Sequence, residues 1–170
     1  ISSRMAHYDD ALRGVQGLFR ASREVDRAEY RVFVDSLELA DRYPGVQAVG
    51  FAPRVETHNL DQTAAAARAS GVDDYRIRPP THGVEHYPIE FIEPFSGRNL
   101  RALGFDIATE PTRWTAMEQA RDGDVAILTS RVTLVQETDQ NVQAGVLLYR
   151  PIYRNGVPCE TVEQRRNALV

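Results

Sequence analysis

Hydrophobic residues recur at intervals of three and four positions along the first part of the chain, which is the spacing of an amphipathic helix. The pattern predicts helix over residues 4–43, in two pieces separated by an interruption at residues 22–25. Asp26, followed three positions later by Glu29, matches a capping box at the start of the second piece. The hydrophobic positions of the two pieces are Leu12, Val15, Leu18 and Phe19, then Tyr30, Phe33, Val34 and Leu37. Such a stripe is most often packed against its own domain, and pairing of the first helix with a second copy is the alternative.

Five runs of alternating or continuously apolar residues follow and predict β-strands. These strands cover residues 46–55, 75–78, 85–93, 125–135 and 144–153. Helices are predicted over residues 59–70 and 111–121, and a last helix opens at residues 161–164 and continues to the end of the sequence. A polar hairpin loop, residues 137–141, joins the two long strands. Because neighbouring strands have hairpin-length connections, the pattern predicts an antiparallel five-stranded sheet with helices packed on it, an α+β fold.

Composition narrows the functions open to a chain of 170 residues, a length that fits one domain. A net charge of −4 and a pI near 5.6 exclude the basic footprint of a nucleic-acid-binding protein. All 20 basic residues are arginine, so chemistry that needs a lysine Schiff base or a lysine general base is excluded. Cys159 is the only cysteine, which excludes a disulfide within the chain and a thiolate metal cluster.

No motif of an enzyme active site occurs in the sequence. A glycine loop for phosphate, a nucleophile elbow and a His-Glu-x-x-His zinc motif are all missing. His82 and His86 are four residues apart, but Gly83 and Pro88 exclude a shared helix face. Exposed loop histidines are therefore expected rather than a metal site. We expect no catalytic residue, no metal and no cofactor in this chain.

The stretch from Glu93 to Arg113 mixes polar and apolar residues and connects a predicted strand to a predicted helix. Irregular loops on a rigid scaffold are where binding residues concentrate. We interpret this stretch as the lid of a ligand pocket, with Thr109 as the N-cap of the following helix and Pro111 in its first turn. The alternative is a plain connection between strand and helix, in which Asp106 only caps the backbone.

Polar residues on the two long strands indicate a binding surface. If these strands are neighbours, one face presents Thr129, Arg131 and Thr133 beside Leu147 and Tyr149. Polar groups among apolar neighbours need hydrogen-bond partners, which a ligand supplies in a small-molecule site. For Arg131 the alternative is an ion pair inside the protein. The acidic candidates for that pair are Asp106 and Glu90, and the predicted apolar wall of the site is Tyr87, Phe91, Phe105 and Trp114.

Several segments, taken in order, resemble the CHASE domain, the extracytoplasmic sensory module of receptor histidine kinases and cyclases. These segments are Tyr43–Val46, Phe51–Val55, Asn99–Asp106, Ala126–Ser130 and Gly145–Tyr153. They stand in order and at fitting spacing across nearly the whole chain. The resemblance implies a long N-terminal helix, followed by a PAS-like module that holds the ligand. It also implies a second, membrane-proximal module and flanking transmembrane helices outside this sequence.

Plant members of this family bind cytokinins, which are adenine derivatives, through an aspartate in the segment that matches Leu103–Ala108. Aligned without a gap, Phe105 takes the position of that aspartate, and a shift of one residue brings Asp106 into it. A threonine that plant members use on the last strand corresponds to Tyr149, whereas Thr129 matches a pocket-side threonine. The resemblance therefore implies a pocket at these positions, and the departures argue against cytokinin as its ligand.

We expect three parts: a helical segment over residues 1–45, a PAS-like ligand-binding module over 46–158, and a truncated helix over 159–170 that leads to a membrane-proximal part. The expected function is periplasmic sensing, in which a small molecule binds the module and the long helix of a homodimer relays binding to a cytoplasmic histidine kinase or diguanylate cyclase. A ligand-free dimerisation module of the same kind of receptor is the alternative, and an extracytoplasmic enzyme is a third hypothesis. The predicted ligand-binding residues are Tyr87, Phe91, Leu103, Phe105, Asp106, Trp114, Thr129, Arg131, Leu147 and Tyr149.

Overall fold

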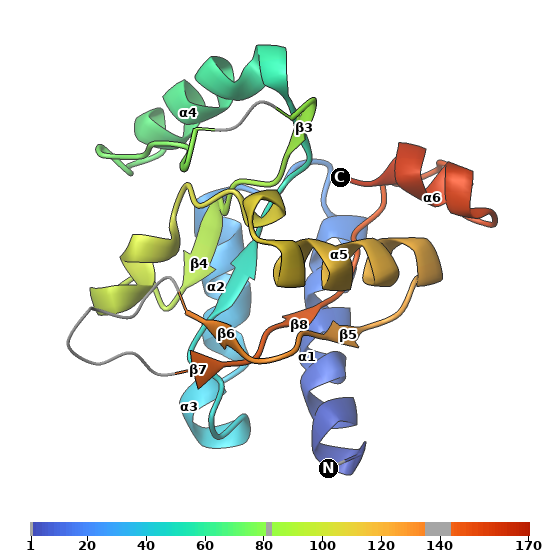
Figure 1. Cartoon of the computed structure of the whole chain (residues 1–170). Helices are drawn as coiled ribbons and strands as arrows, with labels where there is room; N and C mark the ends of the chain where they lie inside the picture. Colours follow the sequence, from blue (N-terminus) through green and yellow to red (C-terminus); the bar gives the residue numbers. More distant parts are fainter. Residues whose placement is uncertain (1, 81–82, 135–143) are drawn as a thin grey trace.

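The chain folds into helices packed around short pairs of antiparallel strands, so the α+β class is confirmed (Figure 1). This computed structural model describes residues 2–80, 83–134 and 144–170. The α-helices are α1 Ser2–Ala21, α2 Arg27–Ser36, α3 Leu39–Arg42, α4 Leu60–Ala69, α5 Pro111–Gly123 and α6 Val162–Ala168. The 3₁₀ helices are η1 Thr57–Asn59, η2 Gly97–Ala102 and η3 Ile107–Thr109. The strands are β1 Val49–Phe51, β2 Val55–Glu56, β3 Glu85–His86, β4 Phe91–Glu93, β5 Ile127–Leu128, β6 Val132–Thr133, β7 Ala144–Gly145 and β8 Leu148–Tyr149.

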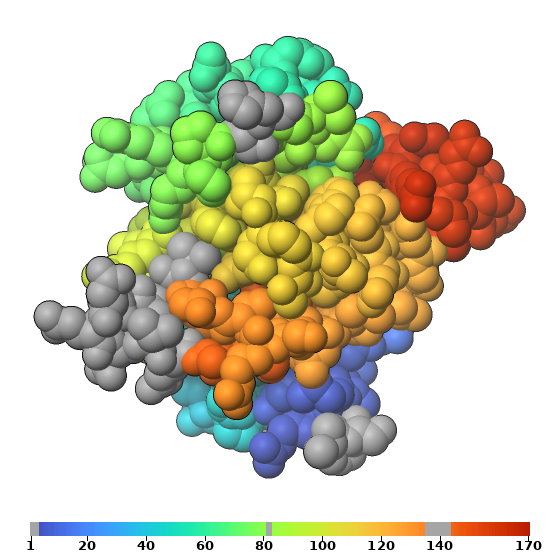
Figure 2. Space-filling model, in the orientation of Figure 1, coloured from blue at the N-terminus to red at the C-terminus, as the bar shows by residue number. Residues whose placement is uncertain are grey.

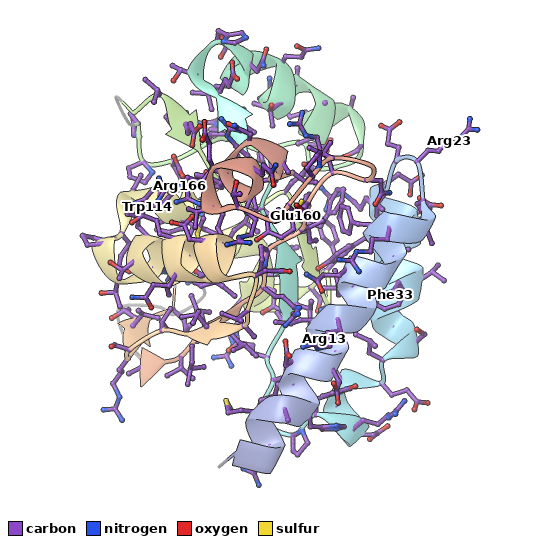
Figure 3. The ribbon with its side chains drawn as sticks, turned by 90° about the vertical axis from the view of Figure 1, so that its right-hand side faces the viewer. Arg13, Arg23, Phe33, Trp114, Glu160 and Arg166 are labelled. Atoms are coloured by element: carbon purple, nitrogen blue, oxygen red, sulfur yellow. The ribbon has the colours of Figure 1, made fainter. Side chains whose placement is uncertain are left out.

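The predicted break after the first helical piece is confirmed, but the second piece, predicted to continue to residue 43, is itself divided into α2 and α3 at Glu38, whose φ is +53°. The capping box of α2 is present, because Glu29 N–H donates to Asp26 Oδ1 at 2.8 Å and Asp26 N–H donates to Glu29 Oε2. α1 and α2 lie side by side, with Phe33 of α2 against Gly14 of α1 (Figure 3). The stripe of α1 packs into a core shared with α2, β1 and β4, whose buried members include Ala11, Val15, Tyr30, Val34, Val49 and Phe91. The stripe is therefore occupied within the chain, and a second copy would have to use another face of α1.

The predicted five-stranded sheet is wrong. Among the described residues the strands form two-stranded antiparallel ladders, which are β1–β4, β2–β3, β5–β8 and β6–β7. β1 and β2 run opposite β4 and β3, but the ladder breaks after the Phe51–Phe91 pair. Pro53 and Pro88 lie in this break, and neither has an N–H to donate to a ladder.

The two long predicted strands do pair with each other, but a β-bulge divides them. Between the ladders β5–β8 and β6–β7, residues 129–131 lie opposite residues 146–147, so one strand carries one extra residue. The bulge breaks the alternation that the pattern predicts. Thr129 is buried and Arg131 is exposed, although the pattern places both on one face. The predicted hairpin loop at 137–141 lies outside the described residues.

The predicted strand at residues 75–78 is also wrong, because this segment joins no ladder in the described part of the chain. Arg78 alone makes a bridge, which is parallel and runs to Phe105. Pro79 and Pro80 follow at once and supply no N–H groups to extend the pairing. Residues 75–78 therefore contact the segment around Phe105 through Arg78 and do not form a strand of a sheet.

α5 lies across β5 and β8 and packs against α6 (Figure 1). Pro111 takes the first helical position, as predicted, but the N-cap is Glu110 rather than Thr109. The Glu110 carboxylate accepts from the N–H groups of Thr112 and Arg113 at 3.1 and 2.9 Å. A longer side chain thus reaches the same unpaired donors that the predicted threonine would have capped.

α6 opens with the capping box that the sequence predicts, formed by Thr161 and Gln164. The prediction that this helix runs to the end of the sequence is wrong, because it ends at Ala168. Leu169 forms an antiparallel bridge to Tyr153, so the last residues return to the strand region.

Candidate ligand-binding site

Residues 103–107 form the centre of the candidate site and are hydrogen-bonded on both sides. Arg78 exchanges two backbone hydrogen bonds with this segment, at 2.8 Å each, and on the other side Ile89 exchanges two, at 2.8 and 3.0 Å. In the space-filling view this segment and α5 occupy the middle of one face, between α4 and α1 (Figure 2). Opening the segment would break bonds on both edges. Residues 103–107 are therefore held in place on both edges, as the wall of a site is. A lid would need a backbone that can open, so the interpretation of this segment as a lid does not fit.

Asp106 lies in this wall and is fully buried. Its Oδ1 accepts from Tyr87 N–H at 2.9 Å and from Ala108 N–H at 3.1 Å, and its Oδ2 lies 2.9 Å from His86 Nδ1. The other ring nitrogen of His86 lies 3.1 Å from Thr57 Oγ1. Each carboxylate oxygen of Asp106 already has a partner inside the fold, so these contacts favour the alternative in which Asp106 caps the backbone.

The histidine pair of the sequence does not form a metal centre in the described part of the chain. His86 is fully buried beside Asp106, so the expectation of an exposed histidine is wrong for this residue. His82 lies outside the described residues. Among the described residues, no group of three or more His, Cys, Asp or Glu side chains could hold a metal ion.

Arg113 projects from the first turn of α5 into the protein, with 4% of its side chain exposed. Its guanidinium carbon lies 4.9 Å from the ring centre of Phe105, and its Nη2 donates to the carbonyl of Thr133 at 3.0 Å. Glu110 Oε2 is 3.8 Å from Arg113 Nε, which is beyond hydrogen-bond distance, because the Glu110 carboxylate is held by the backbone of α5. Arg113 Nε therefore has no hydrogen-bond partner among the described residues and remains a buried donor without an acceptor.

Tyr149 on β8 lies next to Arg113, because α5 packs against β8. Burial raises the pKa of Tyr149 well above its ordinary value, the charge and the side-chain N–H groups of Arg113 act in the opposite direction, and the negative charge of Glu110 adds to the rise. The Tyr149 oxygen is thus close to a donor of Arg113, but its O–H is buried and has no acceptor within the described ranges. Two buried donors from different elements thus lie together, and neither has an acceptor.

Thr129 has a role in the strand pairing itself. Its N–H donates to the carbonyl of Leu147 at 2.8 Å, and its Oγ1 accepts from Leu147 N–H at 2.9 Å. These two bonds replace a regular ladder at the bulge. Thr129 and Leu147, both predicted site residues, are therefore brought together, and the Thr129 hydroxyl is used within the fold.

The remaining predicted site residues lie in several different places. Tyr87 and Trp114 pack against each other, with ring centres 5.5 Å apart. Phe91 belongs to the core under α1 and α2, and Leu103 belongs to a second core under α4. Arg131 is exposed, and neither of the two ion pairs considered for it occurs among the described contacts. The structure thus joins Phe105 and Tyr149 through Arg113, and it does not bring the full predicted set into one site.

Sequence analysis missed Arg113, although a signal for it exists. The buried positions of α5 include Arg113, Ala116 and Ala120, which follow each other at intervals of three and four. Two alanines at this spacing mark the face of a helix that packs closely against its neighbours. An arginine in line with them must be buried with its charge, whereas Trp114, a predicted wall residue of the site, is only half-buried.

The strand that carries Tyr149 is also bonded to α1 on its other side. Arg150 follows Tyr149 directly, and its guanidinium donates to Asp9 Oδ1 at 2.5 Å and to Gln16 Oε1 at 2.8 Å. Gln16 in turn donates to the carbonyl of Pro151 at 2.5 Å. The Arg150 side chain is only 7% exposed, so this polar network between α1 and the end of β8 is largely shielded from water.

A groove with a volume of about 370 Å³ lies between α1 and the β5–β8 pair. Charged residues of α1 and the residue after β8 line it together with apolar residues, among them Met5, Asp9, Arg13, Val125, Leu128 and Arg150. Arg13 marks its position on α1 in Figure 3. No predicted ligand-binding residue lines this groove, so it is a feature of the contact between helix and strands rather than the predicted pocket.

Comparison with known protein families gives a match over most of the chain. The family model for the CHASE domain matches residues 23–170. The matched range begins after α1 and contains Phe105, Arg113 and Tyr149. Among curated proteins no match is found. Within the described part of the chain, none of the helices combines the length and the apolar character needed to cross a membrane.

Proposed function

The chain belongs to the CHASE domain family, and from this premise we propose that it binds a small molecule beside Phe105, Arg113 and Tyr149 and relays the binding through α1. CHASE domains are extracytoplasmic sensor domains of signalling receptors, and they sense extracellular ligands. The sensor domain itself is not catalytic. What the proposal adds to the family assignment is the position of the ligand and the route of the signal.

The observation that carries the proposed site is the pair of buried donors on Arg113 and Tyr149. Buried polar groups in folded proteins nearly always have a hydrogen-bond partner, and each exception calls for an explanation. A ligand that accepts from both groups would complete them. Phe105 supports this position, because its ring lies against the guanidinium of Arg113. It also lies in the segment that resembles the ligand-binding segment of plant members of the family.

The proposed relay uses the alternation of side chains along β8. Tyr149 and Arg150 are consecutive, so one points toward α5 and the other toward α1. A ligand that changes the position of Tyr149 also moves the backbone of Arg150, and thereby the contacts of Arg150 with Asp9 and Gln16. The ligand produces a signal only if it binds one of two arrangements more tightly than the other.

In a full receptor, the proposed arrangement places residues 46–158 as the ligand-binding module between the helical segment 1–45 and the segment 159–170. The module would lie on the periplasmic side of an inner membrane, and a histidine kinase or a diguanylate cyclase would read the position of α1. The extracytoplasmic location of CHASE domains supports this orientation. A homodimer, if it forms through α1, would use the face of the helix that is not packed on α2 and β4.

Thermal unfolding with purines, organic acids and amino acids tests the proposed function. A ligand at about 100 times its Kd stabilises the folded state by roughly 2.7 kcal/mol. For a chain of this size we therefore expect the melting temperature to rise by about 5–10 °C with at least one compound. Phe105→Ala should lose most of this rise, measured against the melting temperature of the variant alone.

Leu128→Ala is the matched control, because Leu128 lines the groove beside α1 and lies outside the proposed site. This variant should keep the full rise in melting temperature. If the rise in melting temperature disappears in Leu128→Ala and persists in Phe105→Ala, the ligand binds in the groove and not beside Phe105. No rise with any compound at saturation would contradict the proposal that this domain binds a small molecule.

A further inference from the structure

Arg113 is one of two arginines with unpartnered buried nitrogens among the described residues, and the other is Arg27. Burial lowers the pKa of Arg27, and the nearby negative charges of Glu90 and Glu93 oppose this effect. Beside Arg113 the acidic group is Glu110, which is partly exposed and whose two oxygens accept from the backbone of α5. Arg113 therefore has a carboxylate 3.8 Å from its Nε but none within hydrogen-bond distance.

The two free donors define the kind of acceptor that fits. The Nε–H of Arg113 carries positive charge and the hydroxyl of Tyr149 is a neutral donor, so an acceptor with two oxygens and one negative charge satisfies both. A neutral carbonyl would leave Glu110, whose carboxylate lies 3.8 Å from Nε and beyond hydrogen-bond distance, as the counter-charge of the guanidinium. A phosphate group would bring further charge and a third oxygen, for which the site offers no additional free donor among the described residues.

We propose that the ligand of this domain is a small carboxylic acid, whose carboxylate accepts from Arg113 Nε and from the Tyr149 hydroxyl while the Phe105 ring supports the guanidinium from below. This inference rests on the proposed function and specifies the ligand class of that site. Binding in this way keeps the existing bonds, because Arg113 Nη2 stays on the carbonyl of Thr133 and Glu110 remains the cap of α5.

The same geometry predicts that Tyr149→Phe has different effects on the free and on the bound protein. In the free protein the O–H is buried without an acceptor, so its removal should leave the melting temperature nearly unchanged. In the complex the variant loses a hydrogen bond to a charged acceptor, so the Kd should rise by about 10-fold. A merely structural role of the hydroxyl would lower the stability and would not change the Kd.

Titration calorimetry with aliphatic and aromatic monocarboxylates, each paired with its primary amide, tests the ligand class. At least one acid should bind the wild-type chain about 100-fold more tightly than its amide, because the amide has no charge to pair with Arg113. Arg113→Gln should remove this preference, and Tyr149→Phe should weaken it by about 10-fold. If Arg113→Gln does not fold, Tyr149→Phe alone carries the test, since its stability is expected to be intact.

Two control variants match these changes elsewhere in the chain. Arg23→Gln removes an exposed guanidinium at the end of α1, far from α5 (Figure 3), and should bind the acid as the wild type does. Tyr153→Phe removes a hydroxyl that donates to the carbonyl of Arg121, so it should lower the melting temperature without changing the Kd.

The outcomes separate the failure of this inference from the failure of the proposed function. If neutral compounds bind beside Phe105 as tightly as acids, and Arg113→Gln binds them unchanged, the carboxylate inference is overturned and small-molecule sensing stands. If no acid binds more tightly than its amide, the inference is likewise overturned. If, in addition, no compound of any class raises the melting temperature, the proposed function fails as well, and a bound water is the better account of the two donors.

Discussion

Gly104 occupies a point in the wall of the site where the backbone leaves no space for a side chain. Its φ is +77°, in the region that residues other than glycine rarely adopt. A Cβ at this position would lie 1.9 Å from the carbonyl oxygen of Arg76, and backbone cannot move aside as a flexible side chain can. The close approach brings residues 103–107 within hydrogen-bond distance of Arg78. A single glycine thus holds Phe105 in position for Arg113.

Gly104→Ala should therefore destabilise the fold by more than its positive φ alone explains. The backbone conformation costs an L-residue about 1–2 kcal/mol, and the clash with Arg76 adds to that amount. Urea unfolding of the variant checks the loss. Gly156→Ala is the matched control, because Gly156 also has a positive φ, +74°, but no atom lies within 4 Å of its Cβ position. Equal losses for the two variants would show that the close approach at Gly104 does not matter.

At the level of residues, the sequence predicted some residues of the candidate site and missed the one that connects them. Phe105 and Tyr149 were predicted, and both lie at Arg113. Arg113 was missed because a charged residue in a helix is usually exposed, and its burial follows only from how α5 packs on β8. The alternative of Asp106 as a backbone cap was foreseen, but its partner His86 depends on pairing between distant segments. The sequence therefore allowed prediction of roles that depend on neighbouring residues, such as the backbone cap at Asp106. It did not allow prediction of contacts between distant segments.

Among the elements, the capping signals proved more reliable than the strand pairing. The boxes at Asp26 and Thr161 are confirmed because each is complete within four residues. The five-stranded sheet is wrong because a ladder needs matched N–H groups on two distant segments. Pro53 and Pro88 remove such groups in one pair, and the bulge at 129–131 shifts the register in the other. The prolines were visible in the sequence, whereas the bulge appears only when the two strands are aligned.

α5 and α6 are joined by a charge cluster around Asp122, which gives a test at this scale. Arg166 donates to both carboxylate oxygens of Asp122, and Arg121 donates to one of them at 2.7 Å. These bonds, that of Arg166 first, hold the pKa of Asp122 well below its ordinary value. A lowered pKa means that the contribution of Asp122 to stability is complete at neutral pH and is lost as the pH falls below the ordinary value of about 3.9.

Asp122→Asn should accordingly reduce the free energy of unfolding at pH 7 by about 1 kcal/mol, a modest value because the cluster is partly exposed to solvent. Near pH 2 the wild type should lose most of this advantage over the variant. Urea unfolding of both proteins at the two pH values measures the difference. Asp10→Asn, at an exposed position of α1, is the control for the loss of one carboxylate outside the cluster. A difference between wild type and Asp122→Asn that stays constant with pH would contradict the assignment.

For the whole molecule, β8 and the residue that follows it contact both the candidate site and α1. Tyr149 lies beside Arg113 of α5, and Arg150, directly after β8, bonds to Asp9 and Gln16 of α1. The two contacts belong to consecutive residues, so a displacement of one requires a displacement of the other. Coupling between two sites requires an element with two arrangements that both sites influence, and β8 is our proposal for that element.

Backbone hydrogen exchange, measured with and without the compound that gives the largest rise in melting temperature, tests this account most directly. We predict that the ligand slows exchange in residues 103–113 and at β8, and that it also changes exchange in α1 around Asp9 and Gln16. In Arg150→Gln the first effect should persist and the second should disappear, because the bonds between β8 and α1 are lost. Protection of residues 103–113 in the wild type, with exchange in α1 unaltered at saturating ligand, would contradict the relay through β8.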